Sequence, residues 1–197
     1  MASIEAGPDG KPVLTVADAE DLRAWLGKEH GRTDGVWLVL GRPGSDLPRI
    51  PYEQTIAELL SAGWIDASVR TLDERRSALW ISPRRKGSVW SGPNKARVAR
   101  LQAEGRMLPA GQAVVDRAVA DGTWTVLDGP ERLEVPDDLA VALLDAGSGV
   151  RQAWDDLPPS LRKLLLSQLA LAKTPPTRAR RVDAAVAAAR EKAGVEE

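Results

Sequence analysis

The chain lacks cysteine and phenylalanine, and it has only one histidine and one tyrosine among its 197 residues. The absence of cysteine excludes disulfides, thiolate nucleophiles and cysteine-based metal sites. The single histidine, His30, excludes zinc sites built from several histidines, and a Ser-His catalytic arrangement requires His30 itself. The sequence therefore predicts no metal and no cofactor, and it identifies no catalytic residue.

Long apolar runs are also missing. Residues 1–16, "MASIEAGPDGKPVLTV", have neither a basic start nor an apolar core, so we expect no signal peptide. A membrane-spanning helix needs roughly 20 apolar residues. The strongest run, "LRKLLLSQLALA", is shorter and contains an arginine and a lysine, which is typical of a packed helix. We expect no membrane span and a cytoplasmic location.

Charge is nearly balanced in sum, at −1, but unevenly distributed. No acid lies between Glu74 and Glu104 or between Asp156 and Asp183. These two basic windows hold 14 of the 27 Lys and Arg residues, which leaves 13 against 28 Asp and Glu elsewhere. The asymmetry indicates a positive face on an otherwise acidic body. The alternative is that these cations pair with acids from the other segments.

The hydrophobic pattern predicts an α+β fold. In the N-terminal half it favours a small antiparallel sheet with helices, from strands at 13–16, 35–41, 64–72 and 77–82 and helices that begin at Asp18 and Pro51. From Pro83 onward the pattern is helical, and prolines and glycines mark the helix ends. We expect residues 1–90 to form an α+β domain and 91–197 a helical region packed on it, either as a second domain or as part of one continuous domain.

The segment "PRRKGSVWSGPN" (83–94) combines cations, small polar residues and a tryptophan. A helix that starts near Ser91 would offer backbone N–H groups to an anion. Arg84 and Arg85 would bind a phosphate or carboxylate, and Trp90 would stack on a ring. Under the other interpretation Ser91 is a plain helix cap, and Trp80 and Trp90 belong to the core. Ser88 and Asn94 complete the predicted ligand-binding set in this segment.

Asp66 follows Trp64 and Ile65 at the start of a predicted strand. A buried carboxylate needs a partner, and Arg84 or Arg85 across the hairpin is the natural one. A structural ion pair is favoured over a general base.

Two further cations, Lys173 and Arg178, continue the apolar faces of the last two helices across "KTPPTR". This position turns them inward, toward a ligand or toward an acid such as Asp66 or a glutamate early in the chain. We hypothesise that both converge with Asp66, Arg84 and Arg85 on one pocket.

Other candidates are weak. The loop "GRPG" (41–44) lacks the spacing of a phosphate-binding fingerprint, and "PDD" (136–138) is typical of a helix start rather than a metal site. His30 is expected at a helix end on the surface, and Tyr52 in the core.

The motifs G-W-I-D (63–66), P-R-R-x-x-S-x-W-S-x-x-N (83–94), M-x-P-A-G (107–111) and A-K-x-x-x-T-R-x-R (172–180), together with "ADGTW" (120–124), carry a resemblance. From about Trp25 to Arg181 the chain resembles the bacterial YdeI/OmpD-associated family, also called bacteriocin-protection proteins. Serine, alanine and glycine stand before the tryptophan of G-W-I-D, where relatives often have cysteine, and Pro176 stands where an acid commonly precedes T-R. The resemblance implies a stress-response role in tolerance of antimicrobial peptides, and it implies no established reaction.

Three functions follow from these observations. The first is a cytoplasmic bacteriocin-protection protein that binds an anionic small molecule or an acidic partner protein at a basic pocket. The second is a nucleic-acid-binding protein that uses the basic Arg/Trp face, which a pI near 6.0 opposes. The third is an enzyme acting on a phosphorylated or carboxylated small molecule, with Asp66 as its base.

Overall fold

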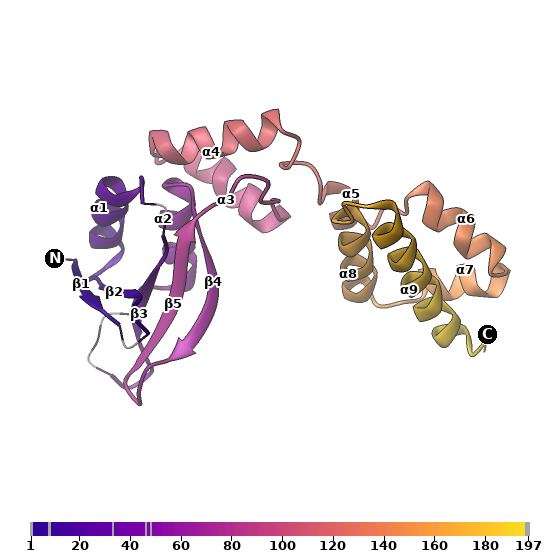
Figure 1. The fold of residues 1–197 in the computed structure, drawn as a ribbon, viewed down its shortest axis with the longest axis horizontal. Helices are drawn as coiled ribbons and strands as arrows, with labels where there is room; N and C mark the ends of the chain where they lie inside the picture. Colours follow the sequence, from indigo (N-terminus) through magenta and orange to yellow (C-terminus); the bar gives the residue numbers. More distant parts are fainter. Residues whose placement is uncertain (1, 8, 33, 46, 48, 196–197) are drawn as a thin grey trace. The chain divides into compact units, whose positions relative to one another are not determined.

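The computed structural model describes residues 2–7, 9–32, 34–45, 47 and 49–195. The chain divides into two compact units (Figure 1). Unit 1 comprises Met1–Ser88 and Pro93–Thr123, and unit 2 comprises Val89–Gly92 and Trp124–Glu197. Unit 1 thus contains α3 (Gly92–Ala103), apart from Gly92, and α4 (Pro109–Ala120), which lie beyond the predicted domain range of 1–90.

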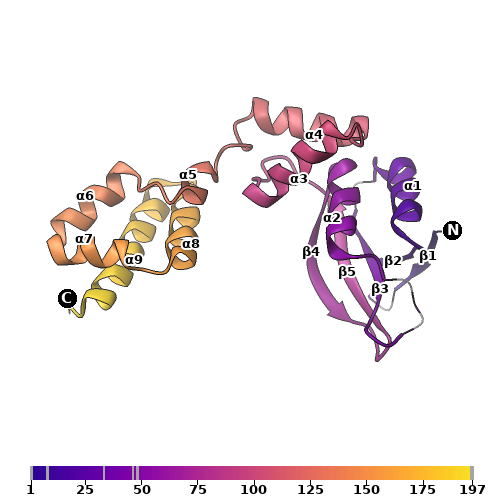
Figure 2. The same ribbon diagram turned by 180° about the vertical axis from the view of Figure 1, so that it is seen from behind.

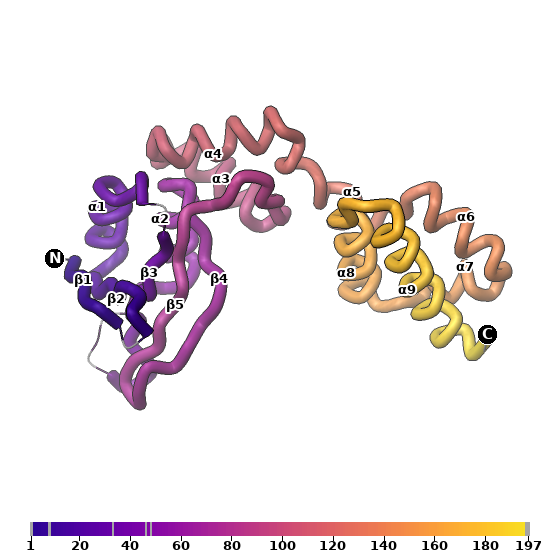
Figure 3. Tube along the Cα trace, in the orientation of Figure 1, coloured from indigo at the N-terminus to yellow at the C-terminus, as the bar shows by residue number. Residues whose placement is uncertain are grey.

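Unit 1 contains a five-stranded sheet in the order β1-β2-β3-β5-β4. Its strands are β1 (Ser3–Ala6), β2 (Pro12–Thr15), β3 (Val36–Gly41), β4 (Trp64–Thr71) and β5 (Arg76–Pro83). The neighbours β4 and β5 run side by side along the Cα trace (Figure 3). The sheet confirms the α+β class, but it is mixed rather than wholly antiparallel because β2 and β3 pair in parallel. A parallel pair needs a crossover, and α1 supplies it.

The helices α1 (Ala19–Glu29) and α2 (Tyr52–Ser61) lie on one face of this sheet (Figure 2). Asp18 caps α1 as expected, since its carboxylate accepts the backbone N–H of Asp21 at 2.8 Å. The side chains alternate along the strands, so the cross-strand pair Leu38 and Leu79 is buried on one face. The next pair, Trp37 and Trp80, meets edge to face at 5.1 Å on the other.

The helices α3 (Gly92–Ala103) and α4 (Pro109–Ala120) follow β5, and two motif glycines let α4 approach α2. The backbone N–H of Leu108 donates to the carbonyl of Ser61 at 2.9 Å. A Cβ added to Gly111 would lie 2.0 Å from that same carbonyl oxygen, so only glycine fits there. Gly63, with φ +78°, has no room either, because its Cβ would lie 2.7 Å from Val114. The glycines of G-W-I-D and M-x-P-A-G therefore serve packing.

A buried carboxylate on α2 joins three parts of unit 1. Glu58 is only 4% exposed. It accepts a hydrogen bond from Arg23 of α1 at 2.9 Å and another from Arg106, which lies between α3 and α4. Arg23 also donates to the Arg106 carbonyl at 2.9 Å. Because a buried charge must be compensated, this ion network joins α1, α2 and the connection between α3 and α4.

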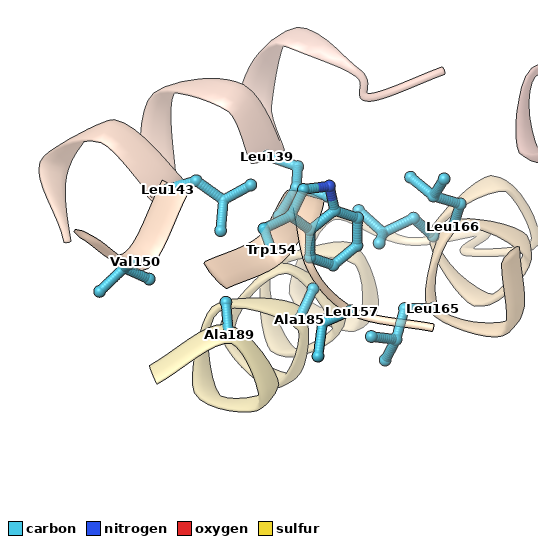
Figure 4. Packing of buried hydrophobic residues seen from close by; sticks show 10 residues of the cluster. Leu139, Leu143, Val150, Trp154, Leu157, Leu165, Leu166, Ala185 and Ala189 are labelled. Atoms are coloured by element: carbon cyan, nitrogen blue, oxygen red, sulfur yellow. The ribbon is translucent and has the colours of Figure 1, made fainter. Parts of the chain in front are cut away.

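Unit 2 is helical and has a core of its own. Its helices are α5 (Asp128–Glu131), α6 (Asp137–Asp145), α7 (Ser148–Asp155), α8 (Pro159–Ala170) and α9 (Pro175–Ala193). Trp154 of α7 is fully buried, and Figure 4 shows its indole among leucines of α6 and α8 and alanines of α9. The small Ala185 and Ala189 allow α9 to pack closely on α7. None of the described helices is both long and apolar enough to cross a membrane.

Replacing Glu58 by glutamine should destabilise unit 1, because two arginines lose their shared counter-charge. Both arginines are partly exposed, so we expect a loss of about 2 kcal/mol in the free energy of unfolding, measured by urea denaturation. The matched control is Glu104→Gln, which removes the exposed partner of Arg106 and should cost less than about 1 kcal/mol. Equal losses for the two variants would contradict the role of burial.

Candidate functional site

Asp66 lies near the start of β4, on the side of the sheet that faces α2. It pairs across the sheet with Ile81, and its carboxylate accepts a hydrogen bond from the Tyr52 hydroxyl at 3.1 Å. The prediction that Tyr52 belongs to the core is wrong, because this side chain is 58% exposed at the start of α2. Burial raises the pKa of the Tyr52 hydroxyl, and the negative charge of Asp66 and their hydrogen bond raise it further.

Arg84 is the buried cation of this neighbourhood. It is 5% exposed and follows directly after β5. Its backbone N–H donates to the Gly63 carbonyl at 2.9 Å, and its guanidinium donates to the Ser88 hydroxyl at 3.1 Å. Burial lowers the pKa of Arg84 to about 10, and the charge of Asp66 opposes that shift. Arg84 thus stays charged at neutral pH with Asp66 as a counter-charge, whereas Arg85 is exposed.

Arg97 of α3 belongs to the same cluster, although the sequence did not single it out. Its guanidinium makes two hydrogen bonds to Glu53, at 2.9 and 2.6 Å, and a third to Asn94 at 3.0 Å. The hydrogen bond from Arg97 lowers the pKa of Glu53. Asn94 was predicted to contact a ligand, but in the structure its side chain orients Arg97. The two residues lie three positions apart on a helix, and this spacing is the only sequence signal for their contact.

We name Tyr52, Glu53, Asp66, Arg84 and Arg97 the Asp66 cluster. All five belong to unit 1. Each acid has a cation or a hydroxyl beside it, so the cluster is a compensated network. Such a network holds the ends of α2, β4, β5 and α3 together. It agrees with the interpretation of Asp66 as part of a structural ion pair rather than as a general base.

Trp90 and Ser91 belong to unit 2. Trp90 is only 1% exposed, and its ring packs against Trp124 at 4.9 Å, so no face of the indole is open to a ligand. The start of α3, predicted to bind an anion, already holds one. The carboxylate of Glu131 accepts the backbone N–H of Gly92 at 3.1 Å and also pairs with Lys163.

Lys173 and Arg178 line one hollow of about 620 Å³ at the junction of α8 and α9, which we name the α8–α9 hollow. Its lining is Asp138, Ala172, Lys173, Thr174, Pro175, Arg178, Ala179, Val182 and Asp183. The sequence predicted that both cations turn inward at this junction. Arg178 is half-buried, but Lys173 is exposed, and both line this hollow.

Arg178 is paired, but with an acid that the sequence reasoning did not name. It donates to both carboxylate oxygens of Asp138, at 2.6 and 2.8 Å, and to the Leu169 carbonyl at 3.2 Å. The expected partner was Asp66 or an early glutamate, but the observed partner is Asp138, the last residue of "PDD". The hydrogen bond from Arg178 lowers the pKa of Asp138. Lys173, by contrast, is exposed and forms no ion pair with any described residue.

The predicted ligand-binding set is thus divided between the units. Asp66, Arg84, Arg85, Ser88 and Asn94 lie in unit 1, and Trp90, Ser91, Lys173 and Arg178 lie in unit 2. The convergence of the two groups on one pocket stays a prediction.

Several cations of the two basic windows pair with acids outside those windows, which is the alternative that the charge pattern left open. These pairs are Arg76–Asp73, Arg97–Glu53, Arg162–Asp155, Lys163–Glu131 and Arg178–Asp138. His30 lies at the end of α1, where its Nδ1 is 2.9 Å from the Gly27 carbonyl oxygen, as expected. Within the described ranges no group of three or more His, Cys, Asp or Glu side chains is arranged to hold a metal ion.

Comparison with known families divides the chain in nearly the same way as its structure does. Residues 14–114 match a family described as "Domain of unknown function (DUF8412)", and the chain belongs to this family. Residues 132–192 match "Bacteriocin-protection, YdeI or OmpD-Associated", so the helical unit is a member of the family that the sequence motifs indicated. No curated protein and no solved structure matched this chain.

The bacteriocin-protection match is narrower than the predicted extent from Trp25 to Arg181. It contains A-K-x-x-x-T-R-x-R and therefore the α8–α9 hollow. The motifs G-W-I-D, P-R-R-x-x-S-x-W-S-x-x-N and M-x-P-A-G lie instead within the segment that matches the other family.

Tyr52 is the one tyrosine of the chain, so phenolate absorbance reports its ionisation alone. Since the Asp66 charge raises the pKa of Tyr52, Asp66→Asn should move the titration midpoint down, toward the ordinary value of about 10. Because Arg97 acts in the opposite direction, Arg97→Gln should move it up. Near-ultraviolet absorbance over a pH series measures both shifts.

The control is Asp116→Asn, an exposed change on α4 that should leave the Tyr52 midpoint in place. Circular dichroism over the same pH range shows whether the fold persists. A midpoint that stays unchanged in both cluster variants would remove Tyr52 from the Asp66 cluster.

Proposed function

We propose that this protein, whose helical unit belongs to a bacteriocin-protection family, acts by binding an acidic group of a ligand or partner protein in the α8–α9 hollow. The observation that carries the proposal is Lys173. It is an exposed cation in the lining of the hollow, it has no ion pair among the described residues, and it lies in the segment that matches the family. The cytoplasmic location expected from the sequence is part of the proposal.

The lining indicates what accompanies the acidic group. Ala172, Pro175, Ala179 and Val182 supply apolar surface, and a volume of about 620 Å³ is ordinary for a small-molecule site. Two acids, Asp138 and Asp183, also line the hollow. A ligand with several negative charges would be repelled by them, so the arrangement favours one acidic group attached to an apolar body.

Lys173 is the donor that such a group would use. The guanidinium of Arg178 already donates hydrogen bonds to Asp138 and to the Leu169 carbonyl. The start of α9 offers little, because Pro175 and Pro176 have no N–H and the N–H of Thr177 donates to the Thr174 hydroxyl at 3.4 Å. The ammonium of Lys173 therefore remains as the group that can reach an incoming carboxylate.

Lys173→Gln should weaken binding of an acidic group about tenfold or more, because a charge-assisted hydrogen bond is lost. The surviving fraction of a susceptible bacterium that expresses the parent or the variant, counted after exposure to a bacteriocin, measures the effect. The variant should protect less than the parent. Lys192→Gln, an exposed change near the end of α9 outside the hollow, should protect as well as the parent. Equal protection by the parent and Lys173→Gln would contradict the proposal.

Nucleic-acid binding is less well supported, because Trp90 is buried and several window cations are paired. Polyanion binding would appear as affinity that falls steeply with salt. We expect no such binding of labelled single- or double-stranded DNA or RNA in anisotropy measurements over a salt series. Steep, salt-dependent binding that the triple variant Arg84→Ala, Arg85→Ala, Lys86→Ala abolishes would instead favour the nucleic-acid function.

A further inference from the structure

We propose a second binding site, in unit 1, for a small organic acid with an apolar body. It is a hollow of about 550 Å³ between the end of β3, the start of α2 and the neighbouring part of β5, which we name the Arg42–Arg49 pocket. Its lining is Leu40, Gly41, Arg42, Pro43, Arg49, Ile50, Pro51, Tyr52, Thr55, Thr71, Ser77 and Leu79. The lining residues do not include Asp66, Arg84 or any residue of unit 2.

The pocket exists because α2 does not reach the end of the sheet. Leu40 and Ser77 are cross-strand partners on the face that α2 covers, and Leu79 lies two residues along the same strand. The helix begins only at Tyr52, so its first turn leaves this end of the face uncovered. The small side chains of Ser77 and Thr55 do not fill the space, and the buried Ile50 and Leu79 give it an apolar floor.

The charge of the pocket is positive. Arg42 and Arg49 line it, and none of its described lining residues is acidic. Arg42 donates to the backbone carbonyl of Asp73 at 3.1 Å, so its positive charge is not neutralised there. Arg49 is exposed and forms no ion pair with a described residue. Most arginines discussed above hold a carboxylate, whereas these two pair with none of the carboxylates that the structure describes.

Three hydroxyl groups of the lining also bear on which ligand the pocket can bind. Ser77 donates its proton to the Leu40 carbonyl at 3.3 Å, Thr55 donates to the Pro51 carbonyl at 3.2 Å, and Tyr52 donates to Asp66. Their protons are therefore used within the protein. The donors left for a ligand are the Thr71 hydroxyl and the guanidinium groups, and the latter match the two oxygens of a carboxylate.

Size and polarity together define the ligand class. The volume lies within the range of ordinary small-molecule sites. One carboxylate would meet the two arginines, and an alkyl chain or ring would cover the floor formed by Leu40, Ile50 and Leu79. A neutral analogue would lose the arginine contacts, and a cationic analogue would be repelled.

The test uses the full chain and 8-anilinonaphthalene-1-sulfonate, a fluorescent anion with an apolar body. Octanoate should displace the dye, whereas octanol and octylammonium, which have the same chain length, should displace it far less. In a Lys173→Gln background, which removes the cation proposed to bind acids in the α8–α9 hollow, Arg49→Gln should weaken the octanoate-sensitive binding about tenfold. Adding Arg42→Gln should abolish it. Because Arg49 is exposed, the single variant should keep the fold, which circular dichroism checks.

Two controls assign the signal to this pocket. Arg117→Gln removes an exposed arginine from α4 of the same unit, and it should bind and release the dye as the parent does. The α8–α9 hollow is proposed to bind the same class of ligand, so the arginine variants are compared in a Lys173→Gln background, where only the Arg42–Arg49 pocket should contribute. A failure of this site and a failure of the α8–α9 hollow then give different results. Dye displacement that is equal for octanoate and octanol, or unchanged in the double arginine variant, would overturn the proposal.

Discussion

The compensation of one buried carboxylate, Glu58, is the constraint on which unit 1 depends. Glu58 is held by Arg23 and by Arg106, which come from either side of α2 in the sequence. Glu58 thereby anchors α2, the helix that starts at Tyr52. That start supplies Tyr52 to Asp66 and sets the uncovered end of the sheet. The helix that Glu58 anchors also borders the Arg42–Arg49 pocket, through Tyr52 and Thr55.

Charge pairing also separates structural cations from those that remain for recognition. Arg84, Arg97 and Arg178 lie beside carboxylates and hold segments together. Arg49 and Lys173 are exposed, and no described acid pairs with them. Because a surface ion pair contributes little to stability, an exposed cation that lines a hollow is better explained by binding than by folding. In the basic segment 83–100, Arg84 and Arg97 are structural by the same criterion.

The sequence predicted the secondary structure well because its signals are local. Asp18 caps a helix, an apolar run bounded by glycines marks β3, and prolines and glycines delimit the C-terminal helices. Pairings between distant residues leave no such signal. Asp138 meets Arg178 across 40 residues and Glu53 meets Arg97 across 44, so neither partner could be read from spacing. The Arg42–Arg49 pocket was missed for the same reason, since it depends on where α2 begins relative to the sheet.

The connection between the units has a consequence for dissecting the protein. Unit 2 is discontinuous in the sequence, because Val89–Gly92 belongs to it while Pro93–Thr123 belongs to unit 1. A fragment that starts at Trp124 would lack Trp90 and would leave the indole of Trp124 and the carboxylate of Glu131 without their contacts in that short segment. An exchange of whole units between relatives would therefore need breakpoints after Ser88 and after Gly92 in addition to the one after Thr123.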